Sequence, residues 1–293
     1  MNAARRGGVV LKLDDMVRQI QERYHVVGRT NELRKALTAK LAKRNLMIEG
    51  NIGTGKTIMA KSIAGYFDQE FMRVDGDERF TEHKLVGYFD PPMVMKEGYT
   101  WNSFIEGPLT RAMKSGGVLL INEINRLMET TQNVLLTAMD EHQIIIPKLG
   151  TLVANDGFMV IATQNPSEYV GTTALSEALR DRFVWIWLDY QSEEEEMKIA
   201  SIWSDNTQTG QIGTSVKIAR KTRDHPDIRR GSSVRGAIDI ANIIARFPLT
   251  RESWVLASVM ALATKIELID GCGRTVAEVI EDCVKQVLAP DFR

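Results

Sequence analysis

The sequence predicts an α/β domain that gives way, near residue 190, to an all-helical domain. Up to that point, short apolar runs of strand length alternate with helical stretches. This alternation is typical of a parallel sheet covered by helices on both faces. From residue 192 onward the strand-length runs stop, and amphipathic segments of helix length follow one another.

The composition narrows the class of protein. The chain has 293 residues, 44% hydrophobic and 26% charged, a balance typical of globular rather than disordered proteins. Its formal net charge of −1 argues against nucleic-acid binding through bulk positive charge. Its two cysteines cannot build a disulfide scaffold, and no apolar run approaches the ~18–20 residues of a membrane helix. We see no signal peptide and expect a soluble, cytoplasmic protein without membrane partners.

The elements of the first part follow in order. Two amphipathic helices are predicted over residues 9–26 and 31–43. The run Asn45–Glu49 predicts a buried strand that stops at Gly50, and Ile58–Tyr66 predicts a helix. Four further strand-length runs are Phe71–Val74, Val118–Ile121, Phe158–Ala162 and Val184–Leu188. A loop over residues 86–107 and a hairpin over 143–155 interrupt this part of the chain.

The helical part begins at a predicted cap. Ser192 and Glu195 fit a capping box, and residues 193–196 place acidic side chains at a helix N-terminus. Helical patterns continue over residues 213–223, 232–246, 251–268 and 275–288.

A phosphate-binding loop is the most specific motif. Residues 50–57 match G-x-x-x-x-G-K-T between a predicted strand and a predicted helix. Glycines let successive N–H groups point at one anion, and the helix N-terminus adds partial positive charge. Lys56 can reach the β- and γ-phosphates, and Thr57 can place its hydroxyl on Mg²⁺. The predicted binding residues here are Gly50, Asn51, Ile52, Gly53, Thr54, Gly55, Lys56, Thr57 and Ile58.

The strand Val118–Ile121 ends in Asn122 and Glu123. Nucleotide hydrolases usually carry Asp-Glu here: the aspartate holds the Mg²⁺ shell and the glutamate positions the attacking water. Glu123 is in place to orient water. Asn122 can accept a hydrogen bond from metal-bound water but adds no negative charge. Since losing such a group costs about 10–100-fold in metal affinity or activity, we expect good nucleotide binding with slow turnover. The alternative, that Asn122 only caps the following segment, stays open.

Two further candidates follow later strand and helix ends. Asn165 follows the run Phe158–Ala162 and can sense the γ-phosphate or the attacking water. Arg182, with Arg180 as the alternative, follows a short predicted helix and can enter a neighbouring subunit's site. A local salt bridge to Asp181 would explain these arginines equally.

Arg235 begins a predicted helix, where a cation is poorly placed for the helix dipole. A nearby phosphate would explain its position, although an exposed arginine needs no explanation. Basic residues are frequent between residues 217 and 235, a stripe that fits a subunit interface or solvated face better than a nucleic-acid site.

Together and in this order, these segments resemble the AAA+ ATPases and, within them, the MoxR family. Segments 106–109 and 116–126 look like that family's G-P-L and G-G-V-L-L-I-D-E-I-N-R signatures, with Asn122 as the departure. Ala162–Pro166 looks like its A-T-Q-N-P, and Gly231–Arg235 resembles its G-A-S-P-R. The likeness covers about residues 25–290.

The resemblance implies a five-stranded parallel sheet in the order 5-1-4-3-2. It implies an N-terminal helical segment over 1–26, a nucleotide-binding domain over 27–190 and a helical lid over 191–293. The roles it implies are adenine contact for Val27 and Gly28, Walker A for Lys56 and Thr57, Walker B for Asn122 and Glu123, sensor 1 for Asn165, the arginine finger for Arg182 and sensor 2 for Arg235.

The family also implies ATP and Mg²⁺ as cofactors and a homo-oligomeric, hexameric ring. Loops 86–107 and 143–155 would engage a protein client, and a von Willebrand factor A domain protein is the expected co-protein. The first hypothesis is therefore an ATPase that remodels, activates or matures a client, possible metal insertion included. The alternative is a nucleotide-gated assembly module with weak or no hydrolysis, because of Asn122. A nucleic-acid motor ranks well below both.

Overall fold

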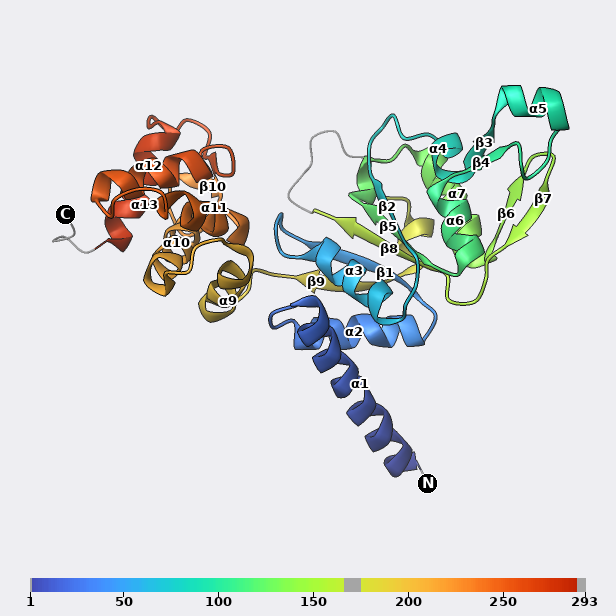
Figure 1. Ribbon diagram of the computed structural model, residues 1–293, viewed down its shortest axis with the longest axis horizontal. Helices are drawn as coiled ribbons and strands as arrows, with labels where there is room; N and C mark the ends of the chain where they lie inside the picture. The colour runs from blue at the N-terminus through green and yellow to red at the C-terminus, as the bar shows by residue number, and fades with distance from the viewer. Residues whose placement is uncertain (1, 166–174, 289–293) are drawn as a thin grey trace. The chain divides into compact units, whose positions relative to one another are not determined.

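The computed structural model of the protein describes residues 2–165 and 175–288 (Figure 1). Pro166, the last residue of the Ala162–Pro166 segment, lies outside the described residues. The chain divides into two compact units, one of Met1–Asn51 with Gly55–Asp189 and one of Ile52–Thr54 with Tyr190–Arg293. In the described part of the chain, no helix combines the length and apolarity needed to cross a membrane.

A parallel sheet lies at the centre of the first unit. Within the described residues it has five strands in the order β2-β5-β8-β1-β9, and each neighbouring pair is parallel. In chain order the strands are β1 (Asn45–Gly50), β2 (Phe71–Asp75), β5 (Val118–Asn122), β8 (Met159–Gln164) and β9 (Phe183–Leu188). The observed order confirms the predicted 5-1-4-3-2.

Both faces of the sheet are covered, which explains the continuous apolar runs. In β5, Leu119 and Ile121 belong to one buried hydrophobic cluster, and Val118 and Leu120 belong to the other. Successive side chains of a strand point to opposite faces, so every residue of this run is buried. All four are fully inaccessible to solvent.

Helices from different parts of the chain contribute to the two clusters. One cluster includes residues of α1 (Asn2–Tyr24), α2 (Thr30–Leu41) and α3 (Lys56–Tyr66). The other includes residues of α4 (Glu82–Val86), α6 (Pro108–Ser115), α7 (Glu129–Asp140) and α8 (Glu177–Arg180). A single 3-10 turn, η1 (Ile124–Arg126), follows β5.

Two antiparallel hairpins extend from this unit. The segment 87–106 forms β3 (Gly87–Phe89), α5 (Pro91–Glu97) and β4 (Phe104–Glu106). The predicted hairpin over 143–155 is confirmed as β6 (Gln143–Ile146) and β7 (Gly150–Val153). Lys148 Nζ, in the turn of the second hairpin, lies 5.9 Å from the ring centroid of Tyr99 in the first. The two hairpins therefore lie side by side (Figure 1).

Over the residues that the structure describes, up to residue 288, the second unit is helical with one short strand pair. Its helices are α9 (Glu193–Trp203), α10 (Thr209–Lys221), α11 (Val234–Ile244), α12 (Arg251–Leu262) and α13 (Val276–Val287). The capping box of Ser192 and Glu195 is confirmed. The sequence analysis missed β10 (Ile228–Arg230), which pairs antiparallel with β11 (Glu267–Leu268). The predicted helix over residues 251–268 was wrong at its end, since α12 stops at Leu262 and β11 follows. Strands this short carry no readable periodicity.

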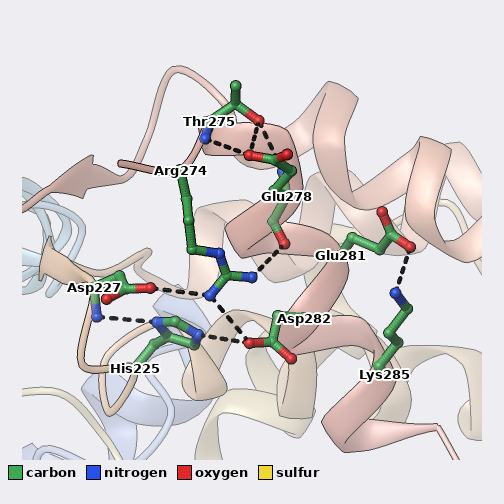
Figure 2. A network of polar contacts seen from close by, with 8 residues as sticks. All are labelled: His225, Asp227, Arg274, Thr275, Glu278, Glu281, Asp282 and Lys285. Atoms are coloured by element: carbon green, nitrogen blue, oxygen red, sulfur yellow. Dashed lines mark hydrogen bonds and ion pairs between the residues drawn. The ribbon is translucent and has the colours of Figure 1, made fainter. Parts of the chain in front are cut away.

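A buried histidine anchors polar contacts in the second unit (Figure 2). His225 Nδ1 accepts from the backbone N–H of Asp227 at 3.1 Å, so Nε2 carries the proton toward Asp282 Oδ2 at 3.3 Å. Arg274 Nη1 lies 3.0 Å from Asp227 Oδ2 and 3.3 Å from Asp282 Oδ2. The His225 hydrogen bond, with help from Arg274, lowers the pKa of the Asp282 carboxyl. These contacts join the loop before β10 to α13.

Candidate active site

Glycines shape the loop between β1 and α3. Gly50, Gly53 and Gly55 have φ angles of 155°, 79° and 94°, which side chains other than glycine rarely adopt. A Cβ on Gly50 would lie 2.2 Å from the carbonyl oxygen of Leu188, so β1 and β9 can pair here only with glycine. A Cβ on Gly55, the N-cap of α3, would meet nothing within 4 Å. Open space at a helix N-terminus, where backbone N–H groups are unpaired, is the kind of place where anions bind.

Lys56 is held across this loop. Its Nζ donates to the carbonyl oxygens of Gly50 at 2.6 Å and Asn51 at 2.9 Å. Thr57 follows in the first turn of α3 and is partly exposed. An ammonium and a hydroxyl thus belong to the loop and the first turn of α3, and these are the side-chain groups that a magnesium nucleotide requires. The other predicted loop residues differ in burial: Thr54 is buried, whereas Ile52 and Ile58 are exposed.

The ends of β5 and β8 bring together the side chains of Asn122 and Thr163 and the backbone N–H of Glu123. The Thr163 hydroxyl donates to Asn122 Oδ1 at 2.8 Å and accepts from the Glu123 backbone N–H at 3.0 Å. Asn165 is buried just beyond the end of β8. Because β8 pairs in parallel with both β5 and β1, these groups share the carboxyl edge of the sheet with the phosphate loop. Ligands of open α/β sheets bind at this edge.

Glu123 adopts an unusual backbone conformation. Its φ of 56° and ψ of 54° are left-handed, which costs a residue with a side chain on the order of 1–3 kcal/mol. Its carboxylate Oε2 lies 2.8 Å from Arg126 Nε. Such strain is concentrated at functional sites. The role of Glu123 in orienting water stays a prediction.

Sequence reasoning missed the partner of Asn122 on the neighbouring strand. Asp75, the last residue of β2, lies opposite Asn122 in the sheet register. Asn122 Nδ2 donates to Asp75 Oδ1 at 3.0 Å, and Arg73 Nη2 binds the same oxygen at 2.6 Å. The available signal was positional, since a polar residue directly follows each of two predicted parallel strands, Phe71–Val74 and Val118–Ile121.

Arg182 lies at the other edge of the sheet. It directly precedes β9, whose first residue, Phe183, pairs with Asn45 at the start of β1. Arg182 Nε and Nη2 donate to Asp140 Oδ2 at 2.7 and 2.6 Å. The alternative finger, Arg180, is exposed at the end of α8. The structure thus separates Arg182 from the phosphate loop.

Arg182 lines a polar cleft of about 490 Å³. Its lining includes Arg44, His142 and Arg182 together with the acidic Asp140 and Asp181. Arginine and carboxylate side chains therefore line one cleft at the edge of the sheet where β1 and β9 begin.

The remaining predicted residues lie elsewhere. Val27 and Gly28 connect α1 to α2, and Gln21 Nε2 donates to the Gly28 carbonyl oxygen at 2.6 Å. The neighbouring Arg29 reaches the carbonyl oxygen of Asp189 at 2.5 Å, which fixes this segment to the end of β9. Arg235 is exposed in the first turn of α11 in the second unit. Their proposed nucleotide contacts stay predictions.

The chain has relatives of known sequence. Residues 45–183 match the family described as AAA domain (dynein-related subfamily). An uncharacterized protein of Staphylococcus aureus (strain NCTC 8325 / PS 47) is 32% identical over 214 residues, which cover 71% of this chain and 81% of the relative. YeaC of Bacillus subtilis (strain 168), also uncharacterized, is 29% identical over 251 residues, or 76% of this chain and 75% of the relative.

Solved structures share the fold. A Cytophaga hutchinsonii protein described as a proposed ATPase superposes with a TM-score of 0.54 at 21% identity and covers 99% of both chains. A RuvB variant of Thermotoga maritima superposes with a TM-score of 0.51 at 18% identity, covering 89% of this chain and 71% of RuvB. At these identities the likeness shows the fold alone.

The phosphate loop between β1 and α3, with polar strand ends beside it, defines the class as a P-loop nucleotide-binding α/β protein. The family match over residues 45–183 defines it further. The chain belongs to the AAA+ ATPases, and its parallel-sheet unit carries an AAA domain of the dynein-related subfamily.

Proposed function

We propose that this chain is a MoxR-type AAA+ ATPase that hydrolyses Mg-ATP in a ring of identical copies and remodels or activates a client protein. The observation that carries the proposal is the separation of Arg182 from the phosphate loop. The two lie at opposite ends of the paired strands β1 and β9, which run in parallel from Asn45 and Phe183 to Gly50 and Leu188.

The length of these strands gives the separation. At ~3.3 Å per strand residue, the backbone of Arg182 lies about 20 Å from that of Gly50. This is far beyond the reach of one side chain. Arg182 is therefore suited to the nucleotide of a second copy, and a head-to-tail ring supplies every copy with such a neighbour.

The residues at the carboxyl edge fit ATP and Mg²⁺. The backbone N–H groups of the loop and Lys56 would hold the phosphates, and Thr57 with Asn122 would hold Mg²⁺ through hydroxyl and amide oxygens. Bound Mg²⁺ neutralises the phosphate charge that develops during hydrolysis. Glu123 would orient the attacking water, and Asn165 would sense the γ-phosphate.

Exposed apolar side chains support client contact by the two hairpins. Met95 is 90% exposed on α5, and Ile145 and Val153 are 74% and 62% exposed on β6 and β7. Exposed apolar side chains on two neighbouring hairpins are typical of protein-binding surfaces. The MoxR resemblance adds a von Willebrand factor A domain protein as the expected co-protein.

The basic stripe gives little support to a nucleic-acid motor. Arg220 and Arg223 bind the buried Glu196 at 3.0 and 2.8 Å, and Arg229 binds Glu267. Ion pairs engage these charges within the second unit. A RuvB structure is described as a Holliday junction branch migration motor, but the likeness to RuvB reaches the fold only.

A second candidate function is a nucleotide-gated assembly module with little or no hydrolysis. It rests on Asn122, which has an amide where a carboxylate normally supports Mg²⁺.

Steady-state ATP hydrolysis with Mg²⁺ tests both candidates, with Lys56→Ala as the control for a contaminating ATPase. We expect the rate per subunit of the unmodified protein to rise with protein concentration, and Lys56→Ala to be inactive. A rate per subunit independent of concentration would contradict the shared site. Nucleotide binding and nucleotide-dependent assembly without turnover would establish the second candidate instead.

A further inference from the structure

Asn122 is fixed between two neighbouring strands. Its Nδ2 donates to Asp75 Oδ1 on β2 at 3.0 Å, and its Oδ1 accepts from the Thr163 hydroxyl on β8 at 2.8 Å. These two contacts set the orientation of the amide. The nitrogen faces β2, and the oxygen faces the strand that adjoins β1 and the phosphate loop.

This orientation places a carboxylate behind the amide. A hydrogen bond from an amide N–H to a carboxylate is charge-assisted, and it polarises the amide so that its oxygen becomes a better acceptor. A negative charge thus lies one hydrogen bond behind Asn122, on the adjacent strand. Position 122 itself carries none.

We propose that Asp75 is a positioning residue that supplies, through Asn122, the negative charge that an aspartate at position 122 would provide for nucleotide-bound Mg²⁺. The inference rests on the proposed function. It assigns the Mg²⁺ support of this AAA domain to a pair of side chains on two strands.

Arg73 opposes this charge. Its guanidinium binds Asp75, but the two side chains are 46% and 61% exposed. Exposed ion pairs are weak and are screened by salt. Arg73 therefore reduces the effect of Asp75 without abolishing it, and Arg73→Gln should strengthen Mg²⁺-dependent nucleotide binding.

A structural explanation competes with the proposal, because the same hydrogen bond also ties the ends of β2 and β5 together. A charge-swap series separates the two. The unmodified pair has one carboxylate, Asp75→Asn has none, Asn122→Asp has two, and the double variant has one again, at position 122. If the hydrogen bond is merely structural, the affinity for Mg²⁺ and nucleotide should not follow the number of carboxylates in the pair.

The measurement is the affinity for a fluorescent ATP analogue, titrated in Mg²⁺ and again in EDTA. We expect Asp75→Asn to weaken binding in Mg²⁺ by about 10-fold or more, as for loss of a metal-supporting group, and to leave binding in EDTA unchanged. The swapped double variant should recover to within about threefold of the unmodified protein.

A melting curve gives a second reading. Asn122→Asp alone places a second carboxylate beside that of Asp75, at hydrogen-bond distance. Because like charges repel, its melting temperature in EDTA should be lower than that of the unmodified protein, and Mg²⁺ with nucleotide should raise it more.

The proposal is overturned if Asp75→Asn binds in Mg²⁺ as the unmodified protein does, or if the swap is as weak as Asp75→Asn. Lys56→Ala distinguishes these results from failure of the proposed function. If Lys56→Ala still binds the analogue normally, the nucleotide site itself is misplaced. If Lys56→Ala loses binding of the analogue and the double variant still binds as weakly as Asp75→Asn, only the role of Asp75 is wrong.

Discussion

Lys56→Ala and Arg182→Ala should each silence ATP hydrolysis, yet a mixture of the two variants should regain part of it. Lys56 lies at the carboxyl end of β1, and Arg182 precedes the start of β9. With about 20 Å of strand between them, one copy cannot bring both to the same phosphate. Each variant therefore keeps the half of the site that the other lacks.

The size of the recovery follows from counting. A site is complete only when its lysine comes from an Arg182→Ala copy and its arginine from a Lys56→Ala neighbour. In an equal, randomly assembled head-to-tail mixture, about one quarter of the sites meet both conditions. Since an arginine finger contributes ~10³–10⁵ in rate, the separate variants give a negligible background.

The assay is steady-state phosphate release at fixed total protein, across mixing ratios from one variant to the other. Activity should peak at equal amounts and fall to the background at both ends. Arg180→Ala, at the exposed end of α8, is the matched control and should behave as the unmodified protein does. An inactive mixture of variants that still assemble, or an active Arg182→Ala alone, would refute the assignment of Arg182 to a second copy's site.

Three further predictions concern stability and the hairpins. Gly50→Ala should lower the free energy of unfolding in urea by about 1–3 kcal/mol, because its Cβ would lie 2.2 Å from the Leu188 carbonyl oxygen; an unchanged midpoint would contradict this. Burial lowers the pKa of Lys40 from 10.5 to about 8, so the unfolded chain binds more protons between these values and stability should rise with pH there; Lys40→Met should flatten that rise. Met95→Asp and Ile145→Asp should each change the free energy of unfolding by less than about 0.5 kcal/mol and leave basal hydrolysis intact, while weakening any stimulation by a client.

The features predictable from sequence are those with a local pattern. An apolar run marks a buried strand, and a glycine marks its end. The predicted strand Asn45–Glu49 is therefore confirmed, and the observed strand includes Gly50 as one further residue. The phosphate loop is a contiguous motif. The sheet order required the family resemblance, since periodicity alone does not say which strands are neighbours.

The features that sequence reasoning missed depend on contacts between distant segments. Asp75 lies 47 residues before Asn122, and only the register of β2 on β5 makes them partners. The ion pair of Arg182 is formed with Asp140, 42 residues away on α7. Asp181 was the local candidate. Pairs of this kind leave no signal in spacing or composition.

The position of Arg182 also constrains the symmetry of any working assembly. If Arg182 completes a second copy's site, each copy presents two unlike edges, one with the phosphate loop and one with the arginine. A two-fold dimer joins like surfaces, so by itself it completes no site. Head-to-tail stacking completes a site at every junction but leaves an open arc with one site fewer than its copies. Only a closed ring gives every copy a complete site. Removing one subunit from such a ring would therefore remove two complete sites, which is more than that subunit's share of the activity.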